Sequence, residues 1–149
     1  MNPFDPKTIL FAKHAQHVAL IHFPIALFVV GVAFDFVAQN AKRAGFAMVA
    51  YYNFLVAAIS TVPVIGTGIL AWQLQLDGEK PKGVLRMHFI FGWASGILIA
   101  LVWFWHFRSR KQEQPTRPVA RLALELLAVG VVMLTGHLGG FVSGVNVPN

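Results

Sequence analysis

Histidine is the residue of this sequence with the most distinctive chemistry, and the chain contains six of them. His17 and His22 stand with Pro24 at the front of the apolar stretch HVALIHFPIALFVVGV. The chain has no cysteine, which excludes disulfides, thiolate zinc sites, iron–sulfur clusters and covalent c-type haem attachment. Any bound metal must therefore be held by imidazole, methionine or oxygen, and histidine is the candidate ligand.

The elements that must position these side chains are membrane-spanning helices. The 149 residues are 56% hydrophobic and 12% charged, with a mean hydropathy of +0.63, which is too apolar for an ordinary soluble domain. Four apolar runs, at 17–38, 46–73, 87–107 and 119–142, each reach the ~20 residues that cross a ~30 Å hydrocarbon core. Short connections between them predict an all-α, up-down-up-down four-helix bundle that forms one domain over residues 1–149. We expect the first helix to be kept, and we see no convincing internal repeat.

The basic residues indicate topology rather than nucleic-acid binding. The net charge is +6, but Lys and Arg lie in the short connections between the apolar runs. The first and third loops carry seven of them, against five for the N-terminal segment plus the second loop. The positive-inside rule then predicts a multi-pass protein of the bacterial inner membrane with both termini outside.

Five of the six histidines fall toward the side that holds the termini. His22 and His137 each lie roughly 7 Å inside their helices at 1.5 Å per residue, so they share a depth. A second level near the membrane surface holds His17 and His88. Because polar side chains within the hydrocarbon region normally face the bundle interior, we expect His22 and His137 to point inward.

Two neutral imidazoles from different helices, in an apolar bundle without cysteine, are the ligands that a b-type haem requires. The sequence therefore predicts a haem-binding electron-transfer protein or subunit, with His22 and His137 as axial ligands. The alternative pair is His17 with His88. Quinone or a larger membrane redox complex is the expected partner, besides the lipid bilayer, and no nucleic acid is expected.

Small residues accompany the histidines. Gly92 and Gly96 follow His88 at one-turn intervals, and Gly140 follows His137. These glycines would let a flat macrocycle approach the helices, but the same spacing serves plain helix–helix packing. They permit a cofactor site without establishing one.

Other polar residues receive structural interpretations. His14 and His106 are expected to contact headgroups or water at the two interfaces. Glu125 lies one turn from Arg121, which predicts a structural ion pair. Asp35 is expected to anchor its helix by pairing with a basic residue of the first loop or with a residue of the fourth helix, or else to take up protons.

The sequence resembles a bacterial family of small four-helix membrane proteins of unknown function. HVALIHFPIALF is similar to the family's opening H-x4-H-F-P-I-A motif, and TGILAW to its T-G-x-x-D-W segment. RMHFIFGW resembles its third-helix entrance, and HLGGFVSGVNV resembles its C-terminal G-G-x-L-V-Y-x-H-G-V-G-V motif. Together these segments span nearly the whole chain.

What the resemblance implies is a four-helix fold and, through the family's likeness to four-helix b-type cytochromes, haem held by histidine. Two positions depart from the pattern: Ala71 replaces the acidic residue before Trp72, and Ser143 and Gly144 stand where the last motif has its histidine. One ligand would therefore have moved, which leaves the second axial ligand open.

Two further functions are compatible with the sequence. The chain could be a non-catalytic anchor or assembly subunit of a larger redox or pigment complex, or part of a homo-oligomer. It could also hold a divalent metal or copper with its outer histidines, or transport protons. Hydrolytic chemistry has no support, because the chain lacks a Gly-x-Ser-x-Gly elbow, a phosphate loop and an H-E-x-x-H helix.

Overall fold

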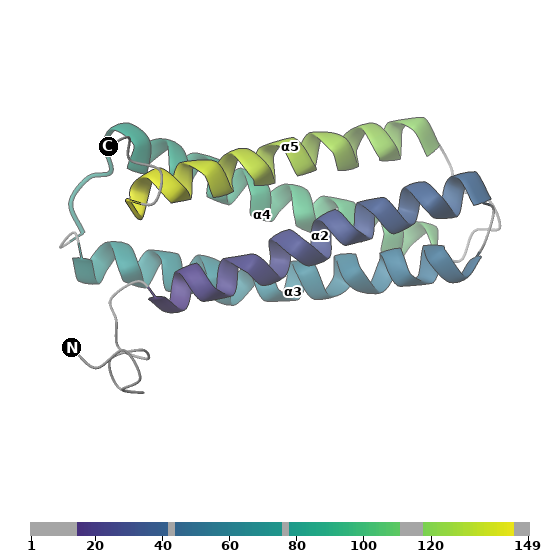
Figure 1. The fold of residues 1–149 in the computed structure, drawn as a ribbon, viewed down its shortest axis with the longest axis horizontal. Coiled ribbons are helices and arrows are strands. Elements are labelled where there is room, and N and C mark those ends of the chain that lie inside the picture. The colour runs from purple at the N-terminus through teal and green to yellow at the C-terminus, as the bar shows by residue number, and fades with distance from the viewer. Residues whose placement is uncertain (1–14, 42–43, 76–77, 111–117, 145–149) are drawn as a thin grey trace.

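Four long helices make up the part of the chain that the computed structural model describes, which is residues 15–41, 44–75, 78–110 and 118–144 (Figure 1). They are α2 (Ala15–Ala41), α3 (Ala44–Gln75), α4 (Gly83–Ser109) and α5 (Pro118–Val142). This order confirms the predicted all-helical fold. Each helix extends beyond its predicted apolar run at one or both ends, because the polar flanking residues continue the helical backbone.

All four helices are long and apolar enough to cross a membrane. The shortest apolar span has 24 residues, which at 1.5 Å per residue is about 36 Å and exceeds a ~30 Å hydrocarbon core. Inside such a core the backbone groups have no water to bond with, so the helix satisfies them internally. The protein is therefore a multi-pass membrane protein.

Successive helices run antiparallel, as Figure 1 shows. α2 packs most closely against α3, and α4 against α5, so the bundle consists of two helical hairpins. Contacts of α3 with α4 and of α2 with α5 join the hairpins, which leaves α2 and α4 diagonally opposite. The first residues of α2 and α4 share one end of the bundle with the last residues of α3 and α5. We call this end the termini end and the other the opposite end.

Each helix buries a stripe of residues spaced alternately by about four and three positions. This is the spacing that antiparallel bundles use to pack one helix face against its neighbours. The stripes are formed by Phe28, Val32, Asp35 and Ala38 on α2, where Pro24 and Gly31 are also buried; Ala50, Phe54, Ala57 and Thr61 on α3; Ser95, Ile99, Val102 and His106 on α4; and Arg121, Glu125, Ala128 and Val132 on α5. The stripes are mainly apolar in the middle of the bundle, where Thr61 and Ser95 are the polar members, and become charged toward its opposite end.

A close contact between α2 and α3 depends on Gly31. The rings of Phe28 and Phe54 are fully buried with centroids 5.4 Å apart, and Phe54 lies directly over Gly31. A Cβ atom on Gly31 would come within 2.8 Å of Phe54 Cε1, a distance that real side chains do not adopt. Glycine at this position therefore lets the first hairpin pack without displacing the Phe54 ring.

Replacement of Gly31 tests this packing. We expect Gly31→Ala to lower the free energy of unfolding by about 1–3 kcal/mol, because the new methyl group forces the buried Phe54 ring to move. Circular dichroism during unfolding of the detergent-solubilised protein measures the change. Gly130→Ala is the matched control, since a Cβ there meets no atom within 4 Å. Equal stability of the two variants would contradict the close-contact interpretation.

Candidate functional site

The inward stripes place polar groups at both ends of the bundle. His17 and Asp35 on α2 are separated along the sequence by the same interval as His88 and His106 on α4. At about 100° and 1.5 Å per residue, this interval makes about five full turns and spans about 27 Å, so both members of each pair lie on the same helix face. Each of these two helices therefore carries one polar group to each end of the bundle interior.

His17 and His88 meet at the termini end. Their ring centroids are 6.4 Å apart and their planes are nearly perpendicular, at 83°. Both side chains are half-buried, and they come from the diagonally opposite helices α2 and α4. The sequence placed these two histidines at a common depth, and the structure brings their rings together.

Each ring is oriented by a backbone carbonyl of the neighbouring helix. His17 Nδ1 lies 3.1 Å from the carbonyl oxygen of Val64, and His88 Nδ1 lies 3.1 Å from that of Thr135. A carbonyl oxygen can only accept, so each Nδ1 carries the hydrogen and donates it. In a neutral ring Nε2 is then the nitrogen with a lone pair, which is the arrangement that metal-ligating histidines adopt.

A glycine lies against each ring, one turn beyond the carbonyl that the ring binds. A Cβ atom on Gly68 would come within 2.9 Å of His17 Cε1, and one on Gly139 within 3.1 Å of His88 Cε1. Any larger residue at these two positions would displace an imidazole. Gly68 was missed as a candidate site residue, whereas Gly139 is one of the small residues that the sequence places around His137.

The two halves of this site are structurally equivalent. The sequence offset from His17 to His88 is the same as that from Gly68 to Gly139, and we call it the hairpin offset. Both imidazole–carbonyl hydrogen bonds join residues 47 positions apart. The two hairpins thus share one arrangement of histidine, carbonyl and glycine at this end of the bundle. The equal histidine-to-glycine spacing of the two hairpins was a signal that the sequence already carried.

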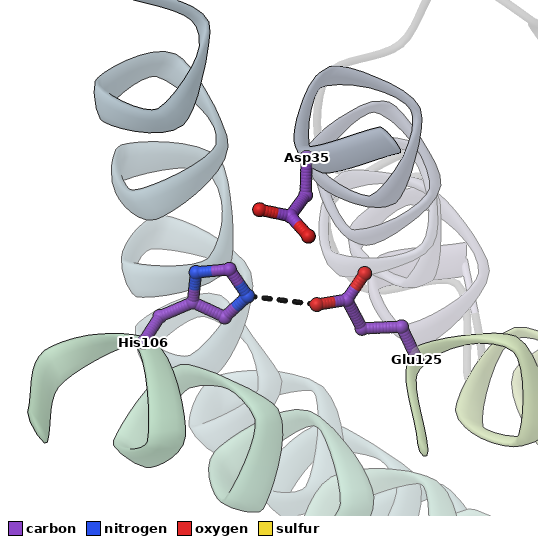
Figure 2. Close-up of side chains that lie close together, drawn as sticks. All are labelled: Asp35, His106 and Glu125. Atoms are coloured by element: carbon purple, nitrogen blue, oxygen red, sulfur yellow. Dashed lines mark hydrogen bonds and ion pairs between the residues drawn. The ribbon is translucent and has the colours of Figure 1, made fainter. Parts of the chain in front are cut away.

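A second polar cluster lies at the opposite end and is more deeply buried. Figure 2 shows Asp35, His106 and Glu125 pointing toward one another from α2, α4 and α5. Their exposed fractions are 1%, 6% and 0%. His106 Nε2 lies 2.8 Å from Glu125 Oε1, and the ring of His106 also packs on Phe54 of α3 at 4.6 Å between centroids.

Arg121 completes this cluster. One of its terminal nitrogens donates to both oxygens of Asp35, at 2.9 and 3.0 Å, and its Nε lies 3.7 Å from Glu125 Oε1. Gln39, one turn beyond Asp35, donates its amide hydrogen to the same carboxylate. Glu125 Oε2 is buried and has no hydrogen-bond partner among the described residues. We call Asp35, His106, Arg121 and Glu125 the opposite-end cluster.

The structure resolves the interpretations of these polar residues. The predicted Arg121–Glu125 ion pair is confirmed, and Asp35 pairs with Arg121 of the fourth helix, one of its expected partners. The prediction that His106 contacts headgroups or water was wrong, because this residue lies on the buried stripe of α4 and hydrogen-bonds Glu125. His14 lies outside the described residues.

His22 and His137 lie on the outer surface of the bundle. Both side chains are exposed, so the expectation that they face inward was wrong. His22 Nδ1 donates to the carbonyl of Val18 in its own helix at 2.8 Å, and His137 meets the ring of Phe141 edge-on. The reason is helical phase: the step from the inward His17 to His22 is a rotation of roughly 140°. Their role as an axial pair stays a prediction.

The predicted glycines differ in environment. Gly96 packs against α3, where a Cβ would lie 3.1 Å from Ile65, which is the helix-packing role foreseen as an alternative. Gly92 faces open space, with no atom within 4 Å of a Cβ built there. The carbonyl of Gly140 accepts a hydrogen bond from Ser143 at the end of α5.

Comparison with known proteins identifies the family. The sequence model of a family described as "Predicted membrane protein (DUF2231)" matches residues 13–146. This match covers nearly the whole chain, so the chain belongs to that family. No curated protein and no solved structure gives a significant match.

The buried ion pair of the opposite-end cluster can be tested by removing one partner. We expect Arg121→Gln to destabilise the protein by about 3–5 kcal/mol, because it leaves the buried Asp35 carboxylate without its counter-charge. Thermal unfolding in detergent measures the loss. The exposed Arg110, whose guanidinium lies over Phe107, provides the control variant Arg110→Gln, for which little change is expected.

The double variant Asp35→Asn, Arg121→Gln adds a second check on the pair. Its destabilisation should be smaller than the sum of the two single effects, because the first substitution already removes the interaction. Additive losses would show that Asp35 and Arg121 stabilise the bundle independently.

Proposed function

We propose that this member of the DUF2231 family binds one b-type haem between α2 and α4, with His17 and His88 as axial ligands, and transfers electrons within the membrane. The observation that carries the proposal is the 6.4 Å separation of the two imidazole centroids. This pair is the alternative that the sequence analysis left open, and the exposed positions of His22 and His137 favour it over that pair.

The separation matches two imidazoles bound on opposite sides of one metal ion. An imidazole nitrogen bonds a metal at about 2.0–2.1 Å, and the ring centre lies about 1 Å farther, so trans rings have centroids roughly 6 Å apart. Ordinary aromatic contacts also have centroids about 4.5–7 Å apart, so this distance supports the proposal together with the tautomer that the ring hydrogen bonds set.

The hydrogen bonds of the rings fit the same role. Both Nδ1 atoms donate to helix carbonyls, which fixes the ring planes and directs Nε2 as the ligand atom. With no cysteine in the chain, a haem here would be held by axial ligation and packing alone, as in b-type cytochromes.

The surroundings fit a macrocycle with one polar edge. Because Gly68 and Gly139 have no side chains, the two imidazole rings fit against their helices. Gly92, one turn from His88, likewise presents no side chain on its face of α4, so a macrocycle could approach the backbone there. Lys82 and Arg86 are exposed at the start of α4 and could pair with propionates at the membrane surface. When bound, haem supplies one-electron redox chemistry; the residues of the chain hold it, orient its ligands and exclude water.

The cellular setting follows from the charge distribution of the loops. We place the protein in the bacterial inner membrane with the termini end on the outer side, because the connections at the opposite end carry more Lys and Arg. The electron partner would then be a membrane quinone or a larger redox complex that reaches this side.

Optical spectroscopy of purified protein, produced with an adequate haem supply, tests the proposal. We expect about one haem per chain with a Soret band and an α-band typical of bis-imidazole ligation. His17→Ala and His88→Ala should each abolish the low-spin spectrum, because an axial ligand is lost. The nearly perpendicular rings also predict a strongly anisotropic low-spin signal in the electron paramagnetic resonance spectrum of the ferric protein.

His22→Ala and His137→Ala are the matched controls, since these histidines lie toward the same end of the bundle but on the outer surface. Both variants should keep the spectrum. If instead they lose haem while the His17 and His88 variants retain it, the first-ranked axial pair from the sequence is the right one. A folded protein that never binds haem would exclude a haem function.

A further inference from the structure

We propose that the opposite-end cluster binds one exchangeable proton, shared between His106 and Glu125 and stabilised by Asp35 and Arg121. This is a second site, about 27 Å along the bundle from the His17–His88 pair, and it does not depend on haem. Its basis is the geometry and the charge of four buried side chains.

The geometry brings the titratable atoms together. Asp35, His106 and Glu125 each offer one ligand atom, and these atoms lie within 4.8 Å of one another. All three side chains are at least nine-tenths buried, and they converge from three helices (Figure 2). A short hydrogen bond of 2.8 Å already joins His106 Nε2 to Glu125 Oε1.

Charge balance then requires one more cation. With both carboxylates ionised, Arg121 protonated and His106 neutral, the cluster has a net charge of −1 inside a membrane-spanning bundle. An uncompensated charge in such a medium is strongly disfavoured, and the group neutralises by taking a proton instead. One added proton brings the cluster to zero.

The added proton can reside on either of the two atoms that this hydrogen bond joins, His106 Nε2 or Glu125 Oε1. In one form His106 is an imidazolium that donates from Nε2 to the Glu125 carboxylate. When the proton crosses to Glu125, the Nε2–H bond breaks and an O–H bond forms, which leaves a neutral imidazole and a carboxylic acid. The total charge is the same in both forms. Glu125 Oε2, buried without a partner among the described residues, is a further position for the proton.

A divalent metal ion fits this cluster less well than a proton. It would change the net charge from −1 to +1 and would lie beside the guanidinium of Arg121. Both oxygens of Asp35 already accept hydrogen bonds from Arg121. A proton needs no new ligands, because it occupies a hydrogen bond that already exists.

The groups around the site come from all four helices. α2 contributes Asp35 and the half-buried Gln39, whose amide hydrogen-bonds Asp35. α3 contributes the uncharged ring of Phe54 over His106. α4 contributes His106, and α5 contributes Arg121 and Glu125. Gln39 is the least buried of these polar residues.

Infrared and nitrogen-15 NMR spectra of the protein in lipid nanodiscs at neutral pH test the proposal. We expect either the carbonyl band of a protonated carboxylic acid or the resonance of an imidazolium at His106. If the acid band is present, selective carbon-13 labelling of Glu should shift it to lower frequency in the unmodified protein. This shift assigns the band to a glutamic acid without any substitution. Glu125→Gln should abolish either signal, and the exposed-site control Glu79→Gln should preserve it.

The proposal is overturned if His106 is a neutral imidazole and no carboxylic acid band is present in the folded protein. Stoichiometric zinc or manganese in the purified protein, lost in Glu125→Gln and retained in Glu79→Gln, would also overturn it in favour of a metal site. Neither result bears on haem binding at the termini end, because the two readouts are independent.

Discussion

The exclusion of unpaired polar groups from lipid is the constraint on which the rest of this structure depends. Within a hydrocarbon core, a charged or hydrogen-bonding side chain must find its partner inside the protein. The inward stripes meet this requirement at the two ends of the bundle, with imidazoles on carbonyls at one end and an ion-pair network at the other. The middle of the bundle carries no charge: Phe28, Phe54, Ile99 and Val102 fill it, and the hydroxyls of Thr61 and Ser95 are hydrogen-bonded there.

The helices could be predicted from the sequence because each apolar run exceeds the length that a membrane requires. Depth could also be predicted, since it follows from position along a helix, and it correctly placed His17 level with His88. The facing of a side chain was harder to foresee. His22 and His137 share a depth but point outward. The direction of a side chain depends on helical phase, and a helix that is apolar on all faces gives no pattern from which that phase can be read.

His106 is the member of the opposite-end cluster that the sequence did not place there. It stands near the end of an apolar run beside Arg108, a position typical of the interface. Its partner Glu125 lies beyond a connection and on another helix, so only the phase of α4 relative to α5 brings the two together. The equal intervals from His17 to Asp35 and from His88 to His106 were the signal that would have placed both distant residues on the inward stripe.

The equivalence of the two hairpins differs between the ends of the bundle. At the termini end, residues related by the hairpin offset are chemically identical, His17 with His88 and Gly68 with Gly139. At the opposite end the related residues are unlike: Asp35 corresponds to His106, and Phe54 to Glu125. Like residues at equivalent positions suit a site built from two matching imidazoles, whereas neutralising an acid requires a base. The difference between the two hairpins at the opposite end is what lets a single chain hold a self-contained charge network.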